Sequence, residues 1–246
     1  MTVDFEIEGF KFVALNGGPL FKFTPAISFF VGCKTIEEID RLWSKLGAGG
    51  SVLMELDKYP FAERYGWLQD KFGLSWQLSM GDQPQKIIPS LLYVGKVAGK
   101  AEEAIKYYTS IFPDSKIGTL SRYGKGGSDP EGTINYGPFS LAGQSFVAMD
   151  SAFDHKFTFN EAISLMVECE DQPEIDDYWA KLTAGGEESV CGWLKDKYGV
   201  SWQVVPTGMN DILQDPDPVK RERVMKVFFQ MKKIDIAALK AAAVGE

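Results

Sequence analysis

Short apolar blocks separated by polar turns run along this chain and predict strands interleaved with a few helices. The apolar run Ala162–Cys169 has the length of a buried strand, and apolar positions recur at helical spacing within Ala101–Phe112, which Pro113 follows. Two segments, Thr133–Leu141 and Gln144–Met149, flank an Ala-Gly pair and predict a β-hairpin. The pattern therefore favours a mixed α and β chain built from short elements.

Capping residues mark the start of two helices in the same way. Asp171 stands three residues before Glu174, and Thr35 three residues before Glu38, which is the spacing of a capping box. The first pair predicts a helix over Pro173–Leu182, and a Gly-Gly pair ends each of the two helices. The shared caps indicate that one structural unit occurs twice.

The last forty residues predict two more helices. Asp217 is expected to cap a helix with Pro218 at its first position, where a missing N–H costs little. A second short helix is expected over Asp235–Ala243. An apolar stripe on the first of these helices is expected to be buried, and it consists of Val219, Val224, Val227, Phe228 and Met231.

An alignment of the chain with itself shows an internal repeat. All six tryptophans fall into three matched pairs, Trp43 with Trp179, Trp67 with Trp193 and Trp76 with Trp202. The longest matched segments are FEIEGFKFVAL (5–15) with FSLAGQSFVAM (139–149), AISFFVGC (26–33) with AISLMVEC (162–169), and GWLQDKFGLSWQL (66–78) with GWLKDKYGVSWQV (192–204). The first copy has ten extra residues within 51–65.

The first copy lacks a counterpart of Ile87–Ile134, a segment predicted to form a strand, a helix and another strand. We therefore expect an incomplete module at 1–81, a polar linker at 82–86, a complete module at 87–206 and C-terminal helices at 207–246. Without its neighbouring strands, the hairpin at 2–15 would present an open apolar edge, which predicts a second chain and hence a homodimer. The helix carrying Phe228 and Met231 is expected to pack across or against the partner module.

Composition narrows the possible classes of protein. The chain of 246 residues is 45% hydrophobic and 24% charged, which is typical of a folded globular protein. No apolar stretch approaches the roughly 20 residues of a membrane-spanning helix, and residues 1–9 do not resemble a signal peptide, so we expect a cytoplasmic protein without a membrane partner. The net charge of −8 argues against nucleic acid as a partner. Cys33, Cys169 and Cys191 are expected to act as small buried hydrophobes.

These segments resemble a known superfamily. Successive strand-helix-strand-strand-strand units are similar to the vicinal oxygen chelate group, which includes glyoxalases, extradiol dioxygenases and bleomycin-resistance proteins. The phrases ALNGGP (14–19), RYGKGG (122–127), QMKKIDIAALKAA (230–242) and the two long tryptophan-containing segments resemble its PhnB-like branch. The resemblance implies an α+β fold of tandem βαβββ modules, with half-barrel sheets curving round a cleft and the first module truncated at its N-terminus. It also implies a homodimer.

The resemblance also implies positions for a metal, which metal-dependent members hold with a His in a first strand and a Glu in a last strand. Those positions correspond here to Pro89 or Ser90, to Ala162, and to the amides Gln77 and Gln203. Asp150, at the end of another last strand, could still be a ligand, but a single carboxylate does not make a site. We therefore expect no catalytic metal and no cofactor.

Five residues are candidates for the wall of a ligand cleft: Tyr93, Tyr136, Asp150, Trp193 and Gln203. The aromatic members suit a small apolar or aromatic molecule. His155, the single histidine, is a candidate for acid-base chemistry or for packing within a loop, and Cys191 for a nucleophile or a structural thiol.

The leading hypothesis is a cytoplasmic small-molecule-binding protein without a catalytic metal. The alternatives are a glyoxalase-like metal-assisted lyase or isomerase, and the methyltransferase of the branch's legacy label, 3-demethylubiquinone-9 3-methyltransferase. The glycine-rich segments GAGG (47–50) and AGGEES (184–189) follow helices and lead into strands, which is the wrong order for a nucleotide-binding turn. A third hypothesis gives the first copy a purely structural role in dimerisation.

Overall fold

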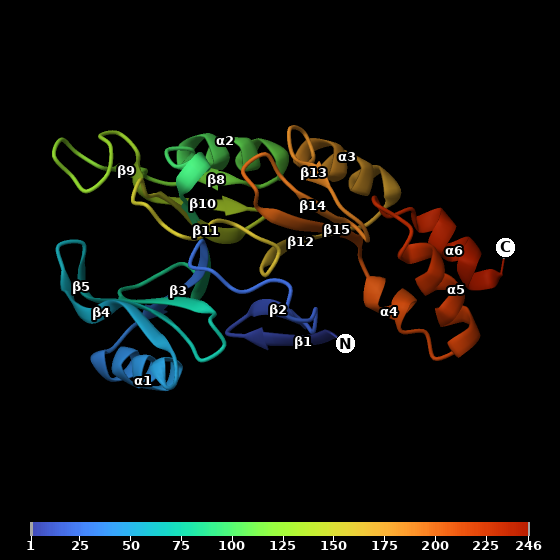
Figure 1. Cartoon of the computed structure of the whole chain (residues 1–246), viewed down its shortest axis with the longest axis horizontal. Helices are drawn as coiled ribbons and strands as arrows, with labels where there is room; N and C mark the ends of the chain where they lie inside the picture. Colours follow the sequence, from blue (N-terminus) through green and yellow to red (C-terminus); the bar gives the residue numbers. More distant parts are fainter. Residues whose placement is uncertain (1, 246) are drawn as a thin grey trace. The chain divides into compact units, whose positions relative to one another are not determined.

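The structure is a computed structural model that describes residues 2–245, and the chain divides into two compact units, 1–162 and 163–246. Unit 1 contains a hairpin and two βαβββ modules, which we call module A (27–80) and module B (87–150). Unit 2 contains module C (164–206) and three helices that follow it (Figure 1). The predicted α+β fold of tandem βαβββ modules is thus confirmed.

Modules A and B share one nine-stranded sheet. Its order is β4-β5-β6-β3-β7-β11-β10-β8, with β9 also paired to β10. Module A supplies β3 (Ile27–Cys33), α1 (Ile36–Gly47), β4 (Ser51–Tyr59), β5 (Ala62–Gln69) and β6 (Ser75–Met80). Module B supplies β7 (Ile87–Tyr93), the 3-10 turn η1 (Gly95–Val97), α2 (Ala101–Ile111), β8 (Lys116–Ile117), β9 (Ser121–Arg122), β10 (Ile134–Leu141) and β11 (Gln144–Asp150).

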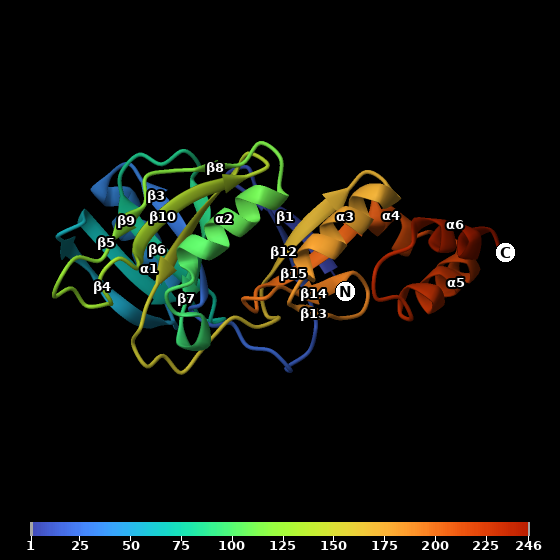
Figure 2. The ribbon, with the colours of Figure 1, turned by 90° about the horizontal axis from the view of Figure 1, so that it is seen from above.

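The first strands of the two modules join the sheet at its centre. β3 and β7 pair antiparallel with Ser28 opposite Ser90, and each lies parallel to the last strand of its own module. The residues 82–86, expected to separate modules, connect two halves of this one sheet, and the compact units divide between Ala162 and Ile163. Helix α1 packs on module A and α2 on module B, each on the side of the sheet toward which Gly66 and Gly137 turn. Figure 2 looks down on α2, with strands of module B beneath it.

The N-terminal hairpin consists of β1 (Thr2–Ile7) and β2 (Phe10–Leu15) and forms a two-stranded sheet of its own. Phe10 and Phe12 pack against Phe29 of β3, with ring centroids 6.1 and 5.2 Å away. Several of its apolar side chains remain exposed, namely Val3, Phe5, Ile7, Val13 and Leu15. Proximity to Phe29 therefore buries this hairpin only in part.

Module C repeats the strand order of module A in a sheet of four strands. It comprises β12 (Ser164–Cys169), α3 (Gln172–Leu182), β13 (Glu187–Glu188), β14 (Trp193–Lys195) and β15 (Ser201–Pro206), in the order β12-β15-β14-β13. A Cβ added at Gly186 would lie 2.1 Å from the carbonyl oxygen of Lys195, and at Gly50 of module A it would lie 2.1 Å from that of Gln69. The glycine after each helix thus permits the same close approach of two backbones.

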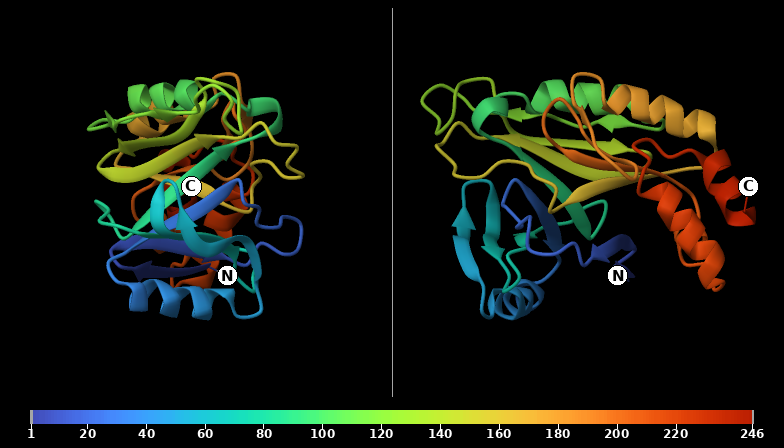
Figure 3. Two further views of the ribbon diagram at one scale, coloured as in Figure 1. Left: turned by 90° about the vertical axis from the view of Figure 1, so that its left-hand side faces the viewer. Right: turned by 45° about the vertical axis from the view of Figure 1, so that its right-hand side comes forward.

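The helical extension comprises α4 (Met209–Leu213), α5 (Pro218–Phe228) and α6 (Ile236–Val244), and α5 and α6 pack side by side (Figure 3). The cap predicted at Asp217 is confirmed, and the short helix expected over Asp235–Ala243 is present, with the Asp235 side chain as its cap. Val224 is buried, but Val219 is exposed, so the predicted buried stripe is wrong at that position. After α5 the chain docks on its own module C, where the N–H groups of Cys191 and Gly192 donate to the carbonyls of Met231 and Lys232.

Candidate functional site

The face of the nine-stranded sheet opposite α1 and α2 carries a cluster of aromatic and polar side chains, which we call the inner face. Phe30 and Tyr65 are buried there with Ile88 and Val147, while Trp67, Tyr136 and Met149 lie at its margin, half-buried. Successive side chains of a strand alternate between faces, so Gly66 and Gly137 turn toward the helices while their neighbours line the inner face. Both modules therefore contribute to one aromatic surface.

A chain of hydrogen bonds crosses the centre of the inner face. The Tyr65 hydroxyl donates to Oε1 of Gln77 at 2.5 Å, and Nε2 of Gln77 donates to the Ser28 hydroxyl at 2.7 Å. Burial raises the pKa of the Tyr65 phenol, which stays protonated and keeps its role as a donor. Gln77 is only 1% exposed. Both polar ends of its amide are thus held in place, which fixes the orientation of the side chain.

Two further hydroxyls lie on the same face. The indole N–H of Trp67 donates to Ser75 at 2.7 Å. Ser90, opposite Ser28 in the central strand pair, is fully buried, and its hydroxyl makes no hydrogen bond within the described residues. A buried hydroxyl without a partner carries a free-energy penalty that a bound polar group could remove.

The tip of the β4–β5 hairpin extends this cluster. Tyr59 and Phe61 stack on each other at 5.5 Å, and each lies edge-on to Tyr65, at 5.7 and 5.2 Å. Phe61 remains 68% exposed. This tip lies in the ten-residue insertion that distinguishes the first copy, where module C has only the short strands β13 and β14. The insertion thus supplies an aromatic rim beside the buried polar chain.

The five sequence-predicted cleft residues lie in different environments. Tyr136 belongs to the inner face, 6.2 Å from Phe30. Tyr93 is fully buried beside Phe159, with its hydroxyl 3.4 Å from that of Tyr108. Trp193 and Gln203 belong to module C of unit 2, where Gln203 donates to Ser164 at 2.8 Å.

The side chain of Asp150 is hydrogen-bonded to the backbone of module B. Its two carboxylate oxygens accept hydrogen bonds from the N–H groups of Ala101 at 3.0 Å and Ile134 at 2.9 Å. Burial raises the pKa of Asp150, against the opposing effect of these backbone donors. The carboxylate therefore holds the start of α2 to β10.

The polar side chains of the inner face and Asp150 do not fit a divalent metal. The amide of Gln77 already forms hydrogen bonds with Tyr65 and Ser28. Both carboxylate oxygens of Asp150 accept hydrogen bonds from backbone N–H groups. Within residues 2–245, no three His, Cys, Asp or Glu side chains gather as a ligand set. A hard cation prefers several carboxylate or imidazole ligands, and the inner face offers an amide and hydroxyls instead.

The remaining candidates for chemistry have local structural roles. His155 lies in the loop after β11, with its Nε2 2.9 Å from the Ser151 hydroxyl and its ring against Phe157. Burial raises the pKa of Cys33 to about 11 and that of Cys169 to about 12, and it also raises the pKa of Cys191. These thiols are poor nucleophiles near neutral pH.

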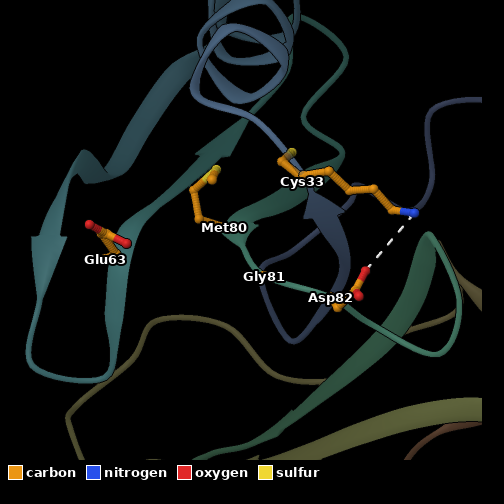
Figure 4. A pocket seen from close by; sticks show the side chains of 6 residues that line it. Cys33, Glu63, Met80, Gly81 and Asp82 are labelled. Atoms are coloured by element: carbon orange, nitrogen blue, oxygen red, sulfur yellow. Dashed lines mark ion pairs between the residues drawn. The ribbon is translucent and has the colours of Figure 1, made fainter.

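A separate surface hollow of about 420 Å³ lies at the end of β6 in unit 1 (Figure 4). Its lining includes Cys33, Glu63 and Met80 together with the exposed pair Lys34 and Asp82, whose charged atoms are 4.0 Å apart. A solvent-exposed pair of this kind contributes little energy. The inner face, with its buried polar chain, is the better candidate site.

Sequence reasoning found this site only in part. It singled out Tyr136 directly, and it named Gln77 and Ser90 only as positions where metal-dependent relatives hold a ligand, but it missed Ser28 and Tyr65. The available signals were the serine shared by AISFFVGC and AISLMVEC and the insertion that ends at Tyr65. No pattern in the sequence could place Ser90 opposite Ser28, because that proximity comes from the pairing of β3 with β7.

The family model and the solved structures that match this chain agree on one family. Residues 1–79 and 85–205 match the family model described as 3-demethylubiquinone-9 3-methyltransferase. A PhnB protein of Bacillus cereus is 43% identical over 50% of this chain and 100% of its own, with a TM-score of 0.47. A Staphylococcus aureus protein is 32% identical over 47% of this chain and 90% of its own, with a TM-score of 0.21. No curated protein matches the chain.

The fold itself extends to more distant structures. Glyoxalase I of Zea mays is 12% identical over 84% of this chain and 77% of its own, with a TM-score of 0.52. At that identity the likeness concerns the fold alone. In the described part of the chain, no helix has both the length and the apolar character needed to cross a membrane.

Proposed function

We propose that this chain, which belongs to the 3-demethylubiquinone-9 3-methyltransferase family within the vicinal oxygen chelate superfamily, binds a small apolar or aromatic molecule on the inner face of unit 1. The observation that carries the proposal is the buried chain Tyr65–Gln77–Ser28, set among aromatic rings and next to the unpartnered hydroxyl of Ser90. Rings provide apolar contact, and a few fixed polar groups provide orientation, as in most small-molecule sites.

The proposed ligand is an aromatic molecule with at least one polar substituent. Its ring would pack against Phe30, Tyr136 and the rim of Tyr59 and Phe61, and its polar group would pair with Ser90. Binding needs no metal in this proposal, because the polar groups of the inner face are amide and hydroxyl groups. The proposal places the protein in the cytoplasm, since its three thiols are free and suit a reducing compartment.

A titration of the full chain with 1-naphthol tests this proposal. Methionine methyl groups labelled with ¹³C report the location, because Met54 and Met149 border the inner face whereas Met209 and Met225 belong to unit 2. We expect saturable shifts of the Met54 and Met149 signals, unchanged by EDTA. Absence of saturation, or shifts confined to methionines of unit 2, would overturn the proposal.

Matched valine variants sharpen the test. Ser90→Val removes the unpartnered hydroxyl of the inner face, and Ser201→Val removes the other buried hydroxyl without a partner, in module C. Because neither hydroxyl makes a hydrogen bond here, both variants are expected to fold. We expect Ser90→Val to weaken naphthol binding about tenfold, the worth of one hydrogen bond, while Ser201→Val leaves it unchanged. Equal affinities in the two variants would remove Ser90 from the site.

The aromatic rim has its own control pair. Phe61→Ala and Phe72→Ala each remove an exposed phenylalanine, but Phe72 lies in the turn after β5, away from the stack with Tyr59 and Tyr65. We expect weaker naphthol binding in Phe61→Ala only, since an aromatic contact contributes about 1 kcal/mol. Unchanged binding in Phe61→Ala would exclude the rim from the site.

A further inference from the structure

The aromatic rim at the tip of the β4–β5 hairpin presents an open ring face to solvent. Phe61 is 68% exposed, and Phe72, in the turn after β5, is 73% exposed. The ammonium of Lys71 lies over the Phe72 ring, 4.9 Å from its centroid, and Lys197 lies over the equivalent Tyr198 of module C at 5.1 Å. Within residues 2–245, no lysine or arginine lies over a ring of the rim. The chain thus places its own cations on other aromatic rings and leaves the rim uncovered.

Carboxylates accompany these rings on the same hairpin. The strand pair β4–β5 sets Asp57 directly opposite Tyr65, and residues directly opposite each other lie on one face of a sheet. Asp57 is exposed and therefore lies at the outer margin of the inner face. Arg64 of the same hairpin forms an ion pair with Asp40 of α1. Three carboxylates and two cations belong to the hairpin, namely Glu55, Asp57, Glu63, Lys58 and Arg64. With Arg64 paired elsewhere, the surroundings of the rim carry an excess of negative charge.

We propose that the ligand of the inner face is an aromatic cation, whose ammonium group is bound by the open ring face of Phe61 and the carboxylate of Asp57. The ring of the ligand keeps the place given to it by the proposed function, on which this assignment rests. The face of an aromatic ring attracts a cation through its quadrupole, and a carboxylate beside it adds a charge of opposite sign. The hydroxyl of Ser90, without a partner in the described residues, remains for a second polar group.

The repeat confines this cation site to module A. Asp57 and the rim both lie in the segment 51–65, where the first copy has its ten extra residues. Module C has only the short strands β13 and β14 in that place, so it lacks a counterpart of both the ring and the carboxylate. The methionines of unit 2 therefore report on any cation that binds elsewhere to this acidic chain.

The first test titrates the full chain with 1-naphthylmethylammonium and with 1-naphthylmethanol, which share ring and linker and differ in charge. Affinity is read from the ¹³C-methyl signal of Met54, which borders the inner face on β4. We expect the ammonium to bind about tenfold more tightly, because a cation–π contact and an exposed ion pair each add a modest gain. The ratio should narrow at about 1 M salt, where the Debye length is about 3 Å.

The outcomes separate the two proposals. Saturable shifts of Met54 with equal affinities for the ammonium and the alcohol would overturn the cation site and leave the proposed function intact. Failure of both probes to saturate Met54 would overturn both proposals. Ammonium-induced shifts confined to Met209 and Met225 of unit 2 would also overturn the cation site.

The second test uses two matched pairs of variants. Phe61→Leu replaces the ring by an apolar side chain, with Phe72→Leu as its control. Asp57→Asn removes the charge but keeps an oxygen that can accept from the Lys58 N–H, as Oδ1 of Asp57 does at 2.7 Å. Its control is Glu37→Gln, in the first turn of α1. We expect Phe61→Leu and Asp57→Asn each to lower the preference for the ammonium over the alcohol about threefold, and the two controls to retain it. An unchanged preference in both test variants would overturn the cation site.

Discussion

Modules A and C have nearly the same local structure but different surroundings. In both, the side chain at the N-cap accepts from the N–H three residues on, Thr35 from Glu38 at 3.1 Å and Asp171 from Glu174 at 3.0 Å. Yet Gln77 is buried in a sheet joined to module B, and its counterpart Gln203 is half-buried in a sheet of four strands. The comparison separates what a module sets by itself from what its neighbour adds.

Cys191 of module C occupies the position that Tyr65 has in module A, and the contacts of the two side chains also depend on the neighbours of each module. Tyr65 donates to Gln77, but the thiol of Cys191 lies 3.6 Å from the carbonyl of Phe228 in the helical extension. Cys191 also has a positive φ of 59°. The position that faces a candidate site in module A therefore anchors the C-terminal helices in module C.

The largest expected effect tests whether the two modules have equivalent cores. Leu68 and Leu194 occupy the same position on β5 and β14, and both are buried. We expect Leu68→Ala and Leu194→Ala each to lower the free energy of unfolding by about 2–5 kcal/mol, through lost burial and a residual cavity. Urea denaturation measures the loss, and hydrogen exchange assigns it to unit 1 or unit 2. A loss in only one variant would contradict equal packing.

The turn after each of these strands offers the next comparison. Asp196 accepts from the N–H groups of Tyr198 and Val200 and from the indole of Trp202, and Asp70 makes the same three bonds in module A. Asp196 is the more buried of the two. We therefore expect Asp196→Ala to cost about 3 kcal/mol and Asp70→Ala about half of that, as measured by urea denaturation. A larger loss in Asp70→Ala would contradict the role of burial.

The paired amides distinguish the modules more directly. Gln77→Leu keeps the volume of the side chain but leaves the buried hydroxyls of Tyr65 and Ser28 without their partner. We expect a loss of about 2 kcal/mol in the free energy of unfolding, and less than about 1 kcal/mol for Gln203→Leu, which affects Ser164 alone. Differential scanning calorimetry checks the order. Equal losses would indicate that pairing with module B adds nothing to this position.

The smallest expected effect depends on pH. Hydrogen bonds from the Lys86 ammonium and the Lys34 N–H lower the pKa of Glu38 from 4.5, and no lysine bonds the side chain of Glu174 in the described structure. The stabilising contribution of Glu38 is therefore present above pH 4.5 and is lost as the pH falls through its lowered pKa. We expect Glu38→Gln to cost about 1 kcal/mol at pH 7 and almost nothing at pH 2, with a smaller cost at pH 7 for Glu174→Gln. A cost independent of pH would exclude the ion pair as its cause.

Much of the fold follows from local sequence. The helix over 101–111, the hairpin turn at Ala142 and Gly143, the caps at Asp171 and Asp217, and the short helix that follows Asp235 are all as predicted. Such features depend on side chains within a few residues of each other, so a short window of sequence contains the information. The short helix α4 is not predicted, because its five residues carry no side-chain cap.

The residues of the candidate site are much harder to predict from the sequence. Asp150 has the residue type of a ligand, but its oxygens bond the backbone of Ala101 and Ile134, which lie far away along the chain. Tyr93 has the residue type of a cleft wall, but it is part of the core. Residue type alone does not show whether a polar or aromatic side chain faces a ligand or its own fold.

The sequence by itself determined the family, the repeated module and the ends of most helices, because these depend on residues close in the chain or on similarity between its segments. Only the tertiary structure decided that module A joins module B through β3 and β7, that Ser28 therefore meets Ser90, and that β12 pairs with β15 alone within residues 2–245. The physical reason is that strands pair through backbone N–H and C=O groups, which are the same whatever the side chains. Equivalent sequences such as ISFFV and ISLMV can therefore have different neighbouring strands.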